Sequence, residues 1–224
     1  MTGIKQLAAA LGVNGALTNM SLAGNELKEE GTKAICEALE QNKTLKELDL
    51  SGSDNIGGAA GAKHVAKMLG VNGSLTVANL LGNRLDAESA KMLAEVAKQK
   101  GISLCGIRRD QTSADFSKQD LEPPDAILLA SDLSQAGVTG SLTSLNLGDN
   151  QLCGHDKYGR GTYTAESISA IADALRVNGG LTTIDLSENQ LCGVNDWGIG
   201  SYTTKSITAI ADALRVNGSL TEVS

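Results

Sequence analysis

Residues 142–152 read Leu-Thr-Ser-Leu-Asn-Leu-Gly-Asp-Asn-Gln-Leu, and residues 181–191 read Leu-Thr-Thr-Ile-Asp-Leu-Ser-Glu-Asn-Gln-Leu. The similarity continues through residue 180, and 24 of 39 positions are identical after a shift of 39 residues. Self-similarity at a fixed period indicates one supersecondary unit stacked on copies of itself. Such arrays usually act through an extended surface and not through a catalytic cleft.

The first half of each repeat has the pattern Leu-x-x-Leu-x-Leu-x-x-Asn-x-Leu. Further copies occupy residues 17–27, 45–56 with one insertion, 75–85 and, more loosely, 102–112, and a last copy opens at Leu220. The Leu-x-Leu alternation predicts a half-buried strand with the leucines on one face. The Asn suits an inward corner, where its amide can satisfy backbone groups that would otherwise be buried without a partner.

The second half of each repeat has helical periodicity. Ile168, Ile171, Ala172 and Leu175 fall at positions i, i+3, i+4 and i+7. We expect Thr164 and Thr203 to cap helix N-termini, and the recurrent Val-Asn-Gly to close helices with a residue in the left-handed conformation. A strand, a helix and a second parallel strand form a right-handed crossover unit.

These patterns resemble leucine-rich repeats of the ribonuclease-inhibitor-like class, whose units are about as long as the 28-, 30- and 27-residue spacings that begin at residues 17, 45 and 75. The longer copies also look like repeats of algal and other protist arrays. The resemblance implies an α/β solenoid, or horseshoe, with a parallel β-sheet on the concave side and α-helices on the convex side. It also implies a protein–protein interaction module.

We expect three segments within one solenoid. Residues 1–101 hold regular repeats, 102–141 form an irregular repeat or connector, and 142–224 hold the long repeats and a truncated last copy. Within the connector, residues 114–121 resemble a second strand and corner, and Pro123 and Pro124 are expected to start a helix. We favour an extra strand in one continuous sheet; a hinge between two blocks is the alternative.

Composition limits the function classes. The net charge of −7 and the lack of a Lys/Arg run argue against a nucleic-acid surface. No apolar run is long enough to span a bilayer, and residues 4–13 match a repeat helix better than a signal peptide. We therefore expect an intracellular protein, in the cytoplasm or inside an organelle.

The cysteines and histidines do not indicate a catalytic site or a metal site. Cys36 and Cys105 fall at inward positions, where a free thiol acts as a small apolar group. Cys153 and Cys192 should lie on neighbouring layers; we favour two packed thiols, with a disulfide or a shared metal as alternatives. His64 and His155 lack partners in a catalytic arrangement. We predict no catalytic residue, no metal site and no cofactor.

The surplus length of the two long repeats lies between strand and helix, in residues 153–163 and 192–202. Insertions of this kind map to one edge of a solenoid, often the binding edge, and they hold the only tryptophan and all the tyrosines. Tyr and Trp often dominate interface energetics. The candidate partner-binding residues here are Tyr158, Arg160, Tyr163, Trp197 and Tyr202. Alternatively, the rings pack on each other only to order the loops.

The concave face of the sheet, from which the residues between the leucines point outward, is a second candidate surface. Its expected outward residues are small and mostly uncharged, and they include Val77 and Leu104. The charged or amide-bearing candidates among them are Lys46, Glu47, Asp49 and Asn79. A tight interface would favour aromatic residues and paired charges, so solvated surface is the simpler interpretation.

We therefore expect a non-catalytic scaffold or adaptor that binds a protein partner of unknown identity. The alternatives are the sensor part of a larger receptor-like protein and a regulator of a GTPase. Because the first and last repeats lack polar caps, we also expect either a longer array or end-to-end docking.

Overall fold

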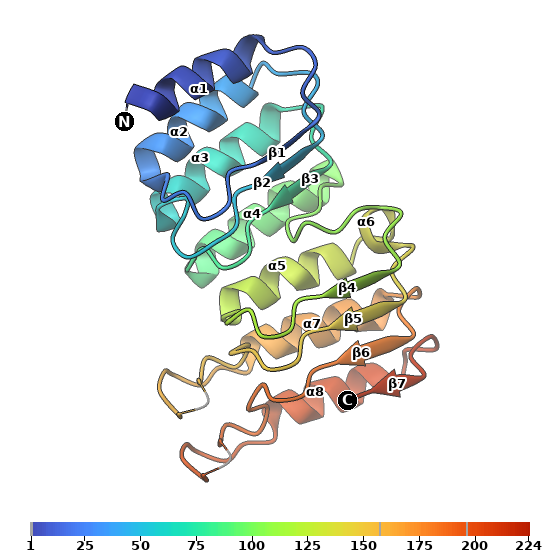
Figure 1. Cartoon of the computed structure of the whole chain (residues 1–224). Helices are drawn as coiled ribbons and strands as arrows, with labels where there is room; N and C mark the ends of the chain where they lie inside the picture. Colours follow the sequence, from blue (N-terminus) through green and yellow to red (C-terminus); the bar gives the residue numbers. More distant parts are fainter. Residues whose placement is uncertain (1, 157, 196) are drawn as a thin grey trace. The chain divides into compact units, whose positions relative to one another are not determined.

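The computed structural model describes residues 2–156, 158–195 and 197–224, and it divides into two compact units. The N-terminal unit is Met1–Ile107 and the C-terminal unit is Arg108–Ser224. In each unit helices alternate with short parallel strands (Figure 1). One strand and the helix that follows it form a layer, and within each unit the layers pack on their neighbours.

The N-terminal unit contains a three-stranded sheet in the order β1-β2-β3. Met20, Leu48 and Ala78 are in register, and Ser103 adds a bridge beside Val77. Its elements are α1 (Thr2–Val13), β1 (Asn19–Ser21), α2 (Lys28–Leu39), β2 (Glu47–Asp49), α3 (Gly58–Val71), β3 (Val77–Asn79) and α4 (Ala87–Lys100).

The C-terminal unit contains a four-stranded sheet in the order β4-β5-β6-β7. Ala114, Leu145, Ile184 and Val223 share one register across this sheet. Its elements are β4 (Ser113–Asp115), α5 (Pro123–Leu133), α6 (Ala136–Thr139), β5 (Ser144–Asn146), α7 (Glu166–Val177), β6 (Thr183–Asp185), α8 (Lys205–Leu214) and β7 (Glu222–Val223).

The irregular segment behaves only partly as the sequence predicts. The extra strand is present as β4, and α5 begins at Pro123 with a capping box between Glu122 and Asp125. However, the described strands form two sheets and not one continuous sheet. The unit boundary at Ile107 divides the 102–141 segment, because β4 pairs with β5 whereas Ser103 pairs with β3.

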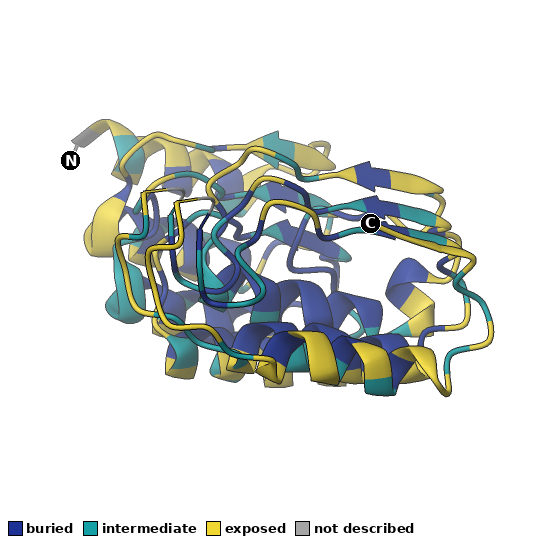
Figure 2. Cartoon of the chain, turned by 90° about the horizontal axis from the view of Figure 1, so that it is seen from below, coloured by how far each residue is buried: buried dark blue, intermediate teal, exposed yellow. Residues whose placement is uncertain are grey.

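The core of each unit is built from the predicted alternation. Leu48, Leu50 and Leu80 are fully buried, while the strand residues between them are partly exposed. The helices bury the side that faces the strands and expose the opposite side (Figure 2). With a coefficient of about 25 cal/mol per Å² of buried apolar surface, each such leucine contributes roughly 2 kcal/mol.

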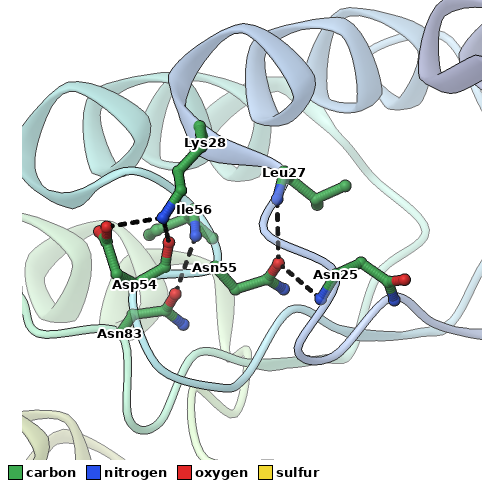
Figure 3. A network of polar contacts seen from close by, with 7 residues as sticks. All are labelled: Asn25, Leu27, Lys28, Asp54, Asn55, Ile56 and Asn83. Atoms are coloured by element: carbon green, nitrogen blue, oxygen red, sulfur yellow. Dashed lines mark hydrogen bonds and ion pairs between the residues drawn. The ribbon is translucent and has the colours of Figure 1, made fainter. Parts of the chain in front are cut away.

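The Asn after the strand satisfies backbone groups of its corner, as predicted, and it also joins one layer to the next. The Asn55 Oδ1 accepts hydrogen bonds from the backbone N–H groups of Asn25 (3.1 Å) and Leu27 (3.2 Å), as Figure 3 shows. Its Nδ2 donates to the carbonyl oxygens of Leu22 (2.9 Å) and Leu50 (3.1 Å). Equivalent bonds are made by Asn83, Asn150 and Asn189.

The expected left-handed closure of the helices is wrong. Asn72, after α3, has φ −68° and ψ 132°, which is extended backbone. Its Nδ2 donates to Leu39 O at 2.7 Å in the preceding layer, while its Oδ1 accepts from the N–H groups of Ser74 and Leu75 at 2.8 Å. The extended conformation lets one side chain satisfy both layers. Asn42, Asn178 and Asn217 repeat this arrangement.

The expected N-caps are displaced by one residue. Ala165 caps α7 and Thr204 caps α8. The Thr164 hydroxyl still accepts from Glu166 N at 3.2 Å, and Thr203 does the same for Lys205 N at 3.3 Å. The threonines therefore satisfy the first helical N–H from outside the helix.

No helix within the described residues has the length and apolar character needed to cross a bilayer.

Candidate functional site

The two insertions of the C-terminal unit fold as matching hairpins, which project from one edge of that unit (Figure 1). His155 bridges Gly161 in the first hairpin, and Val194 bridges Gly200 in the second. Lys157 and Asp196 lie within these loops but outside the described residues. Both insertions thus have the same local architecture although their tips differ in sequence.

One polar side chain organises each hairpin tip. Asp156 Oδ1 accepts from the N–H groups of Tyr158 (2.9 Å) and Arg160 (2.8 Å). Asn195 Oδ1 binds Trp197 N (3.1 Å) and Ile199 N (2.9 Å) in the same way. Sequence reasoning missed this role. The signal was a residue able to form an Asx turn at the same place in both copies.

The glycine at the closing bridge of each hairpin is required by its backbone. Gly161 has φ +109° and Gly200 has φ +125°. A Cβ at either position would collide with the carbonyl oxygen of Gly154 or Gly193, respectively. Only glycine adopts this positive φ easily and has no Cβ to collide. The Gly-x-Gly motif therefore fixes the loop that carries the aromatic residues.

The hairpins bring Tyr158 and Trp197 together. Their rings stack with centroids 6.0 Å apart and an interplanar angle of 18°. The two residues nevertheless remain 50% and 65% exposed, and the Arg160 guanidinium lies 4.9 Å from the Tyr158 ring centroid. Ile199 is also half-exposed beside them. We name Tyr158, Arg160, Trp197 and Ile199 the aromatic ridge.

The two remaining tyrosines have different environments. The half-buried Tyr163 places its hydroxyl 3.2 Å from the Leu191 carbonyl oxygen and 2.7 Å from Ser206 Oγ. Its ring also lies against His155, with centroids 6.0 Å apart. Tyr163 therefore anchors its hairpin to the next layer and is not on the ridge. Tyr202, its counterpart in the last layer, is 72% exposed.

The thiols beneath the hairpins are free. Cys153 lies 3.8 Å from Ser206 Oγ, and no disulfide joins it to Cys192. Burial raises the pKa of the Cys153 thiol to about 11, against a smaller lowering from Ser206. Burial raises the pKa of Cys36 to about 12, and Cys105 is buried as predicted. Both shifts keep the thiols protonated at neutral pH, so these cysteines are weak nucleophiles.

A polar cleft of about 290 Å³ lies beside the ridge, and we name it the acidic cleft. The residues that give it its character are Lys118, Asp120, Asp149, Asp156, Tyr158 and Glu188. The Tyr158 side chain belongs to both features. The aromatic ridge and the acidic cleft are therefore adjacent and share Tyr158.

The strand face of the N-terminal unit holds a shallow hollow of about 300 Å³ that Glu47, Asp49 and Asn79 help to line. Asp49 accepts from Ser51 N at 3.0 Å, and Asn79 accepts from Leu81 N at 3.3 Å. These two side chains thus hold the ends of their own strands. Lys46, the residue before β2, is exposed.

Three residues expected to point outward on that face, Val77, Ser103 and Leu104, are buried. Val77 and Leu104 are at most 6% exposed. Ser103 pairs with Val77, and Leu104 accepts a hydrogen bond from Leu80 N at 2.9 Å. The irregular segment therefore continues the ladder beside β3 and packs its side chains inward, where the loose repeat pattern had suggested solvent.

Apolar side chains are exposed on the outermost helices of each unit, including Leu7 on α1 and both Ile207 and Leu214 on α8. End-to-end docking through these faces stays a prediction.

The described residues contain no group of three or more His, Cys, Asp or Glu side chains placed to hold a metal ion. His64 lies 3.8 Å from the Glu29 carboxylate. His155 is buried, and its Nδ1 has no hydrogen-bond partner among the described residues.

Comparison with known proteins gives partial matches. No family model matches the chain. It is 34% identical over 102 residues to human "NACHT, LRR and PYD domains-containing protein 13", covering 46% of this chain and 10% of that protein. It is 32% identical over 103 residues to the pig ribonuclease inhibitor, covering 46% and 22%, and 32% identical over 119 residues to rat leiomodin-1, covering 47% and 20%.

Solved structures with similar elements include the Caenorhabditis elegans tropomodulin C-terminal domain, with a TM-score of 0.41, 14% identity and coverage of 96% of this chain and 92% of that one. The leiomodin-1 "Actin-Binding Site 2" structure gives a TM-score of 0.43 at 14% identity, covering 95% and 87%. The curated relatives are much longer than their matched parts, which span between about a tenth and a fifth of each.

Proposed function

We propose that this chain, a stack of leucine-rich repeats of the ribonuclease-inhibitor-like class, is a non-catalytic scaffold or adaptor that binds a protein partner through the aromatic ridge. Relatives with the same repeats support a protein-interaction domain. The role as a scaffold or adaptor and the binding surface are the parts that we add.

The observation that carries the proposal is the exposed stack of Tyr158 on Trp197. A loop that needed only internal order would bury its rings, as Tyr163 does against His155 and Ser206. Here the backbone is held by Asp156 and Asn195 while the rings remain in solvent. Rigid, exposed aromatic residues lose little conformational entropy on binding, which suits an interface hot spot.

The non-catalytic part is supported by the state of the nucleophiles. Cys36 and Cys153 are buried, and their pKa values are raised to about 12 and about 11. An enzyme that uses a cysteine needs a lowered thiol pKa and an accessible sulfur atom.

The test is capture of partners from extract of the native cell, followed by mass spectrometry and titration of the purified partner. The double variant Tyr158→Ala, Trp197→Ala should weaken binding roughly 30-fold or more, which is the effect of losing a hot spot of about 2 kcal/mol. The control is Val13→Ala with Val71→Ala, which removes exposed apolar side chains elsewhere. Equal binding by the ridge variant would contradict the proposal.

A second candidate is the recognition part of a larger receptor-like protein. It is favoured by the matches to "NACHT, LRR and PYD domains-containing" proteins, of which this chain spans about a tenth. Sequencing the full transcript for an adjoining nucleotide-binding domain tests it. A transcript that encodes repeats alone would count against this alternative.

A further inference from the structure

The corners after β1 to β6 each place one residue, just before the Asn or Gln of the corner, in the left-handed conformation. In the N-terminal unit these residues are Gly24, Asp54 and Gly82, so Asp54, with φ +53°, is the one carboxylate among them. Lys28 from the preceding layer reaches it, with Nζ 2.9 Å from the Asp54 Oδ2 (Figure 3). The corner carboxylate of this unit is therefore neutralised from within the chain.

In the C-terminal unit the same corner position is held by Lys118 with φ +57°, and by Asp149, before Asn150, and Glu188, before Asn189, both with φ +55°. The position that Lys28 holds, three residues after the corner Asn, is Glu122 in one layer and Cys153 in the next. Among the described residues, neither Asp149 nor Glu188 forms an ion pair. In these two layers the position equivalent to Lys28 therefore holds no cation.

Both carboxylates line the acidic cleft, together with Asp120 and Asp156. Lys118 is the one cation among the described residues that line it. Asp156 is engaged by Arg160 at 3.4 Å, and Asp120 accepts from Gln151 Nε2 at 3.1 Å. The cleft therefore keeps an excess of negative charge around an open volume of about 290 Å³.

One further feature of the cleft fits a cationic occupant. The Oε1 of Gln190, which also lines the cleft, is buried and has no hydrogen-bond donor among the described residues. Carboxylates and a buried acceptor are what a Lys or Arg side chain requires. Tyr158 also lines the cleft, but its ring already stacks on Trp197 and has the Arg160 guanidinium 4.9 Å from its centroid, so the ridge suits an apolar neighbour of the cation.

We propose that the aromatic ridge and the acidic cleft together receive a basic segment of the partner protein. One Lys or Arg side chain of that segment enters the cleft between Asp149 and Glu188, and a neighbouring apolar side chain packs on Trp197. This inference rests on the proposed function, because it specifies the partner of the same ridge. Charge complementarity selects a basic protein segment, since an acidic peptide or a nucleic acid would meet like charge.

The experiment is selection of phage-displayed random peptides on the immobilised full chain, followed by fluorescence anisotropy with the selected peptides. The cleft variant is Asp149→Asn with Glu188→Gln, which keeps side-chain size. Asn readily adopts the left-handed backbone of residue 149. The ridge variant is Tyr158→Ala with Trp197→Ala. The matched control is Asp54→Asn, which removes a carboxylate from the same corner position in the N-terminal unit.

The wild-type chain should enrich peptides in which Lys or Arg stands next to an apolar residue. The cleft variant, or replacement of the peptide cation by Gln, should raise Kd roughly tenfold or more, and the effect should shrink at high salt. The Asp54→Asn control should change Kd less than about twofold, since an exposed charge outside the contact contributes little.

Two results would contradict the inference, and they differ in whether the proposed function survives. If the ridge variant loses binding while the cleft variant does not, the basic occupant is excluded and the proposed function stands. If neither variant loses binding, or the wild-type chain enriches acidic peptides or none, both proposals fail.

Discussion

The two units share one layer plan but differ in what lies between strand and helix. In the N-terminal unit a short corner leads to the helix, and Lys28 meets Asp54 across the layers. In the C-terminal unit a hairpin is inserted, and the equivalent carboxylates Asp149 and Glu188 face an open cleft. The comparison shows that the buried strand-and-helix half of the repeat is kept in both units, while the segment between strand and helix differs.

The same comparison separates two kinds of polar residue. Asn72 and Asn217 lie at the same place in the two units and make the same bonds to the preceding layer. Asp54 and Asp149 also lie at the same place, but their surroundings differ. The Asn residues that join layers thus make the same contacts in both units, whereas the carboxylates at the corners do not.

The largest expected effect comes from breaking the bonds that both units share. Asn72→Ala removes the side chain that binds Leu39 O, Ser74 N and Leu75 N in a buried site. Several backbone groups would then be buried without partners, at about 1–3 kcal/mol each. We expect the free energy of unfolding, measured by urea denaturation, to fall by about 3–5 kcal/mol.

The control for this variant is Asn14→Ala. Asn14 Oδ1 accepts from the exposed N–H groups of Ala16 and Leu17 in the first layer. Water can replace it there, so the loss should stay below about 1 kcal/mol. Equal losses at Asn14 and Asn72 would show that the bonds between layers are not what stabilises the stack.

The next effect is confined to the C-terminal unit. Gly200→Ala places a Cβ against the Gly193 carbonyl oxygen at φ +125°. We expect the second hairpin to open, with a loss of about 2 kcal/mol. Because Trp197 is the only tryptophan, its fluorescence should change towards that of a solvated, unstacked indole.

Gly198→Ala is the matched control. Gly198 has φ +72°, but a Cβ there meets nothing within 4 Å. The strain of about 1 kcal/mol should leave the stack and the Trp197 emission largely unchanged. A Gly200→Ala variant with native emission would mean that the hairpin does not depend on this glycine.

Much of this architecture could be predicted because it follows from periodicity. The leucines of Leu-x-Leu must bury one face of the strand. The amide of Asn55 must satisfy the backbone groups of the corner that follows. The helix-end Asn72 was assigned to the right place but to the wrong conformation. A left-handed turn and an extended residue that binds the neighbouring layer both favour Asn, and only the position of that layer distinguishes them.

The site was less accessible to sequence reasoning for a similar reason. The insertions identified Tyr158 and Trp197, because aromatic residues are rare in this chain. The acidic cleft was not found, since Asp149 and Glu188 look like ordinary corner residues until the missing counterpart of Lys28 is seen. The boundary at Ile107 was also hidden, because β4 and Ser103 both continue the repeat pattern but pair with different strands.

A third prediction concerns pH and the buried thiols. Burial raises the pKa of Cys36 from 9.0 to about 12. The native state therefore keeps a proton that the unfolded chain loses above pH 9, and stability falls as pH rises from about 9 to about 12. The loss from this group should be about 1.4 kcal/mol at about pH 10, where the unfolded thiol is ten parts ionised to one.

The measurement is the pH slope of urea denaturation between about pH 8 and pH 10. Comparing wild type with Cys36→Ala cancels the lysines and tyrosines that titrate in both proteins. The variant should show the shallower slope, even if it is less stable overall. The Cys153→Ala slope should change in the same direction, since the pKa of Cys153 is raised to about 11 by the same cause. Parallel slopes would show that these thiols are accessible to water in the native state.

The smallest expected effect concerns the carboxylates at the corners, Asp54, Asp149 and Glu188. Asp54→Asn removes an exposed pair with Lys28 and should lower the free energy of unfolding by about 0.2–1 kcal/mol. Asp149→Asn with Glu188→Gln should instead leave it unchanged or raise it by a few tenths of a kcal/mol, because it relieves repulsion among carboxylates that line one cleft. Urea denaturation at low salt measures both changes, and high salt should reduce the difference between them.

The two changes in the free energy of unfolding should have opposite signs if the C-terminal carboxylates serve to bind a partner and the N-terminal carboxylate serves to stabilise the fold. A clear loss of stability in the cleft variant would mean that Asp149 and Glu188 already have a structural role, and the contrast between the units would no longer indicate binding.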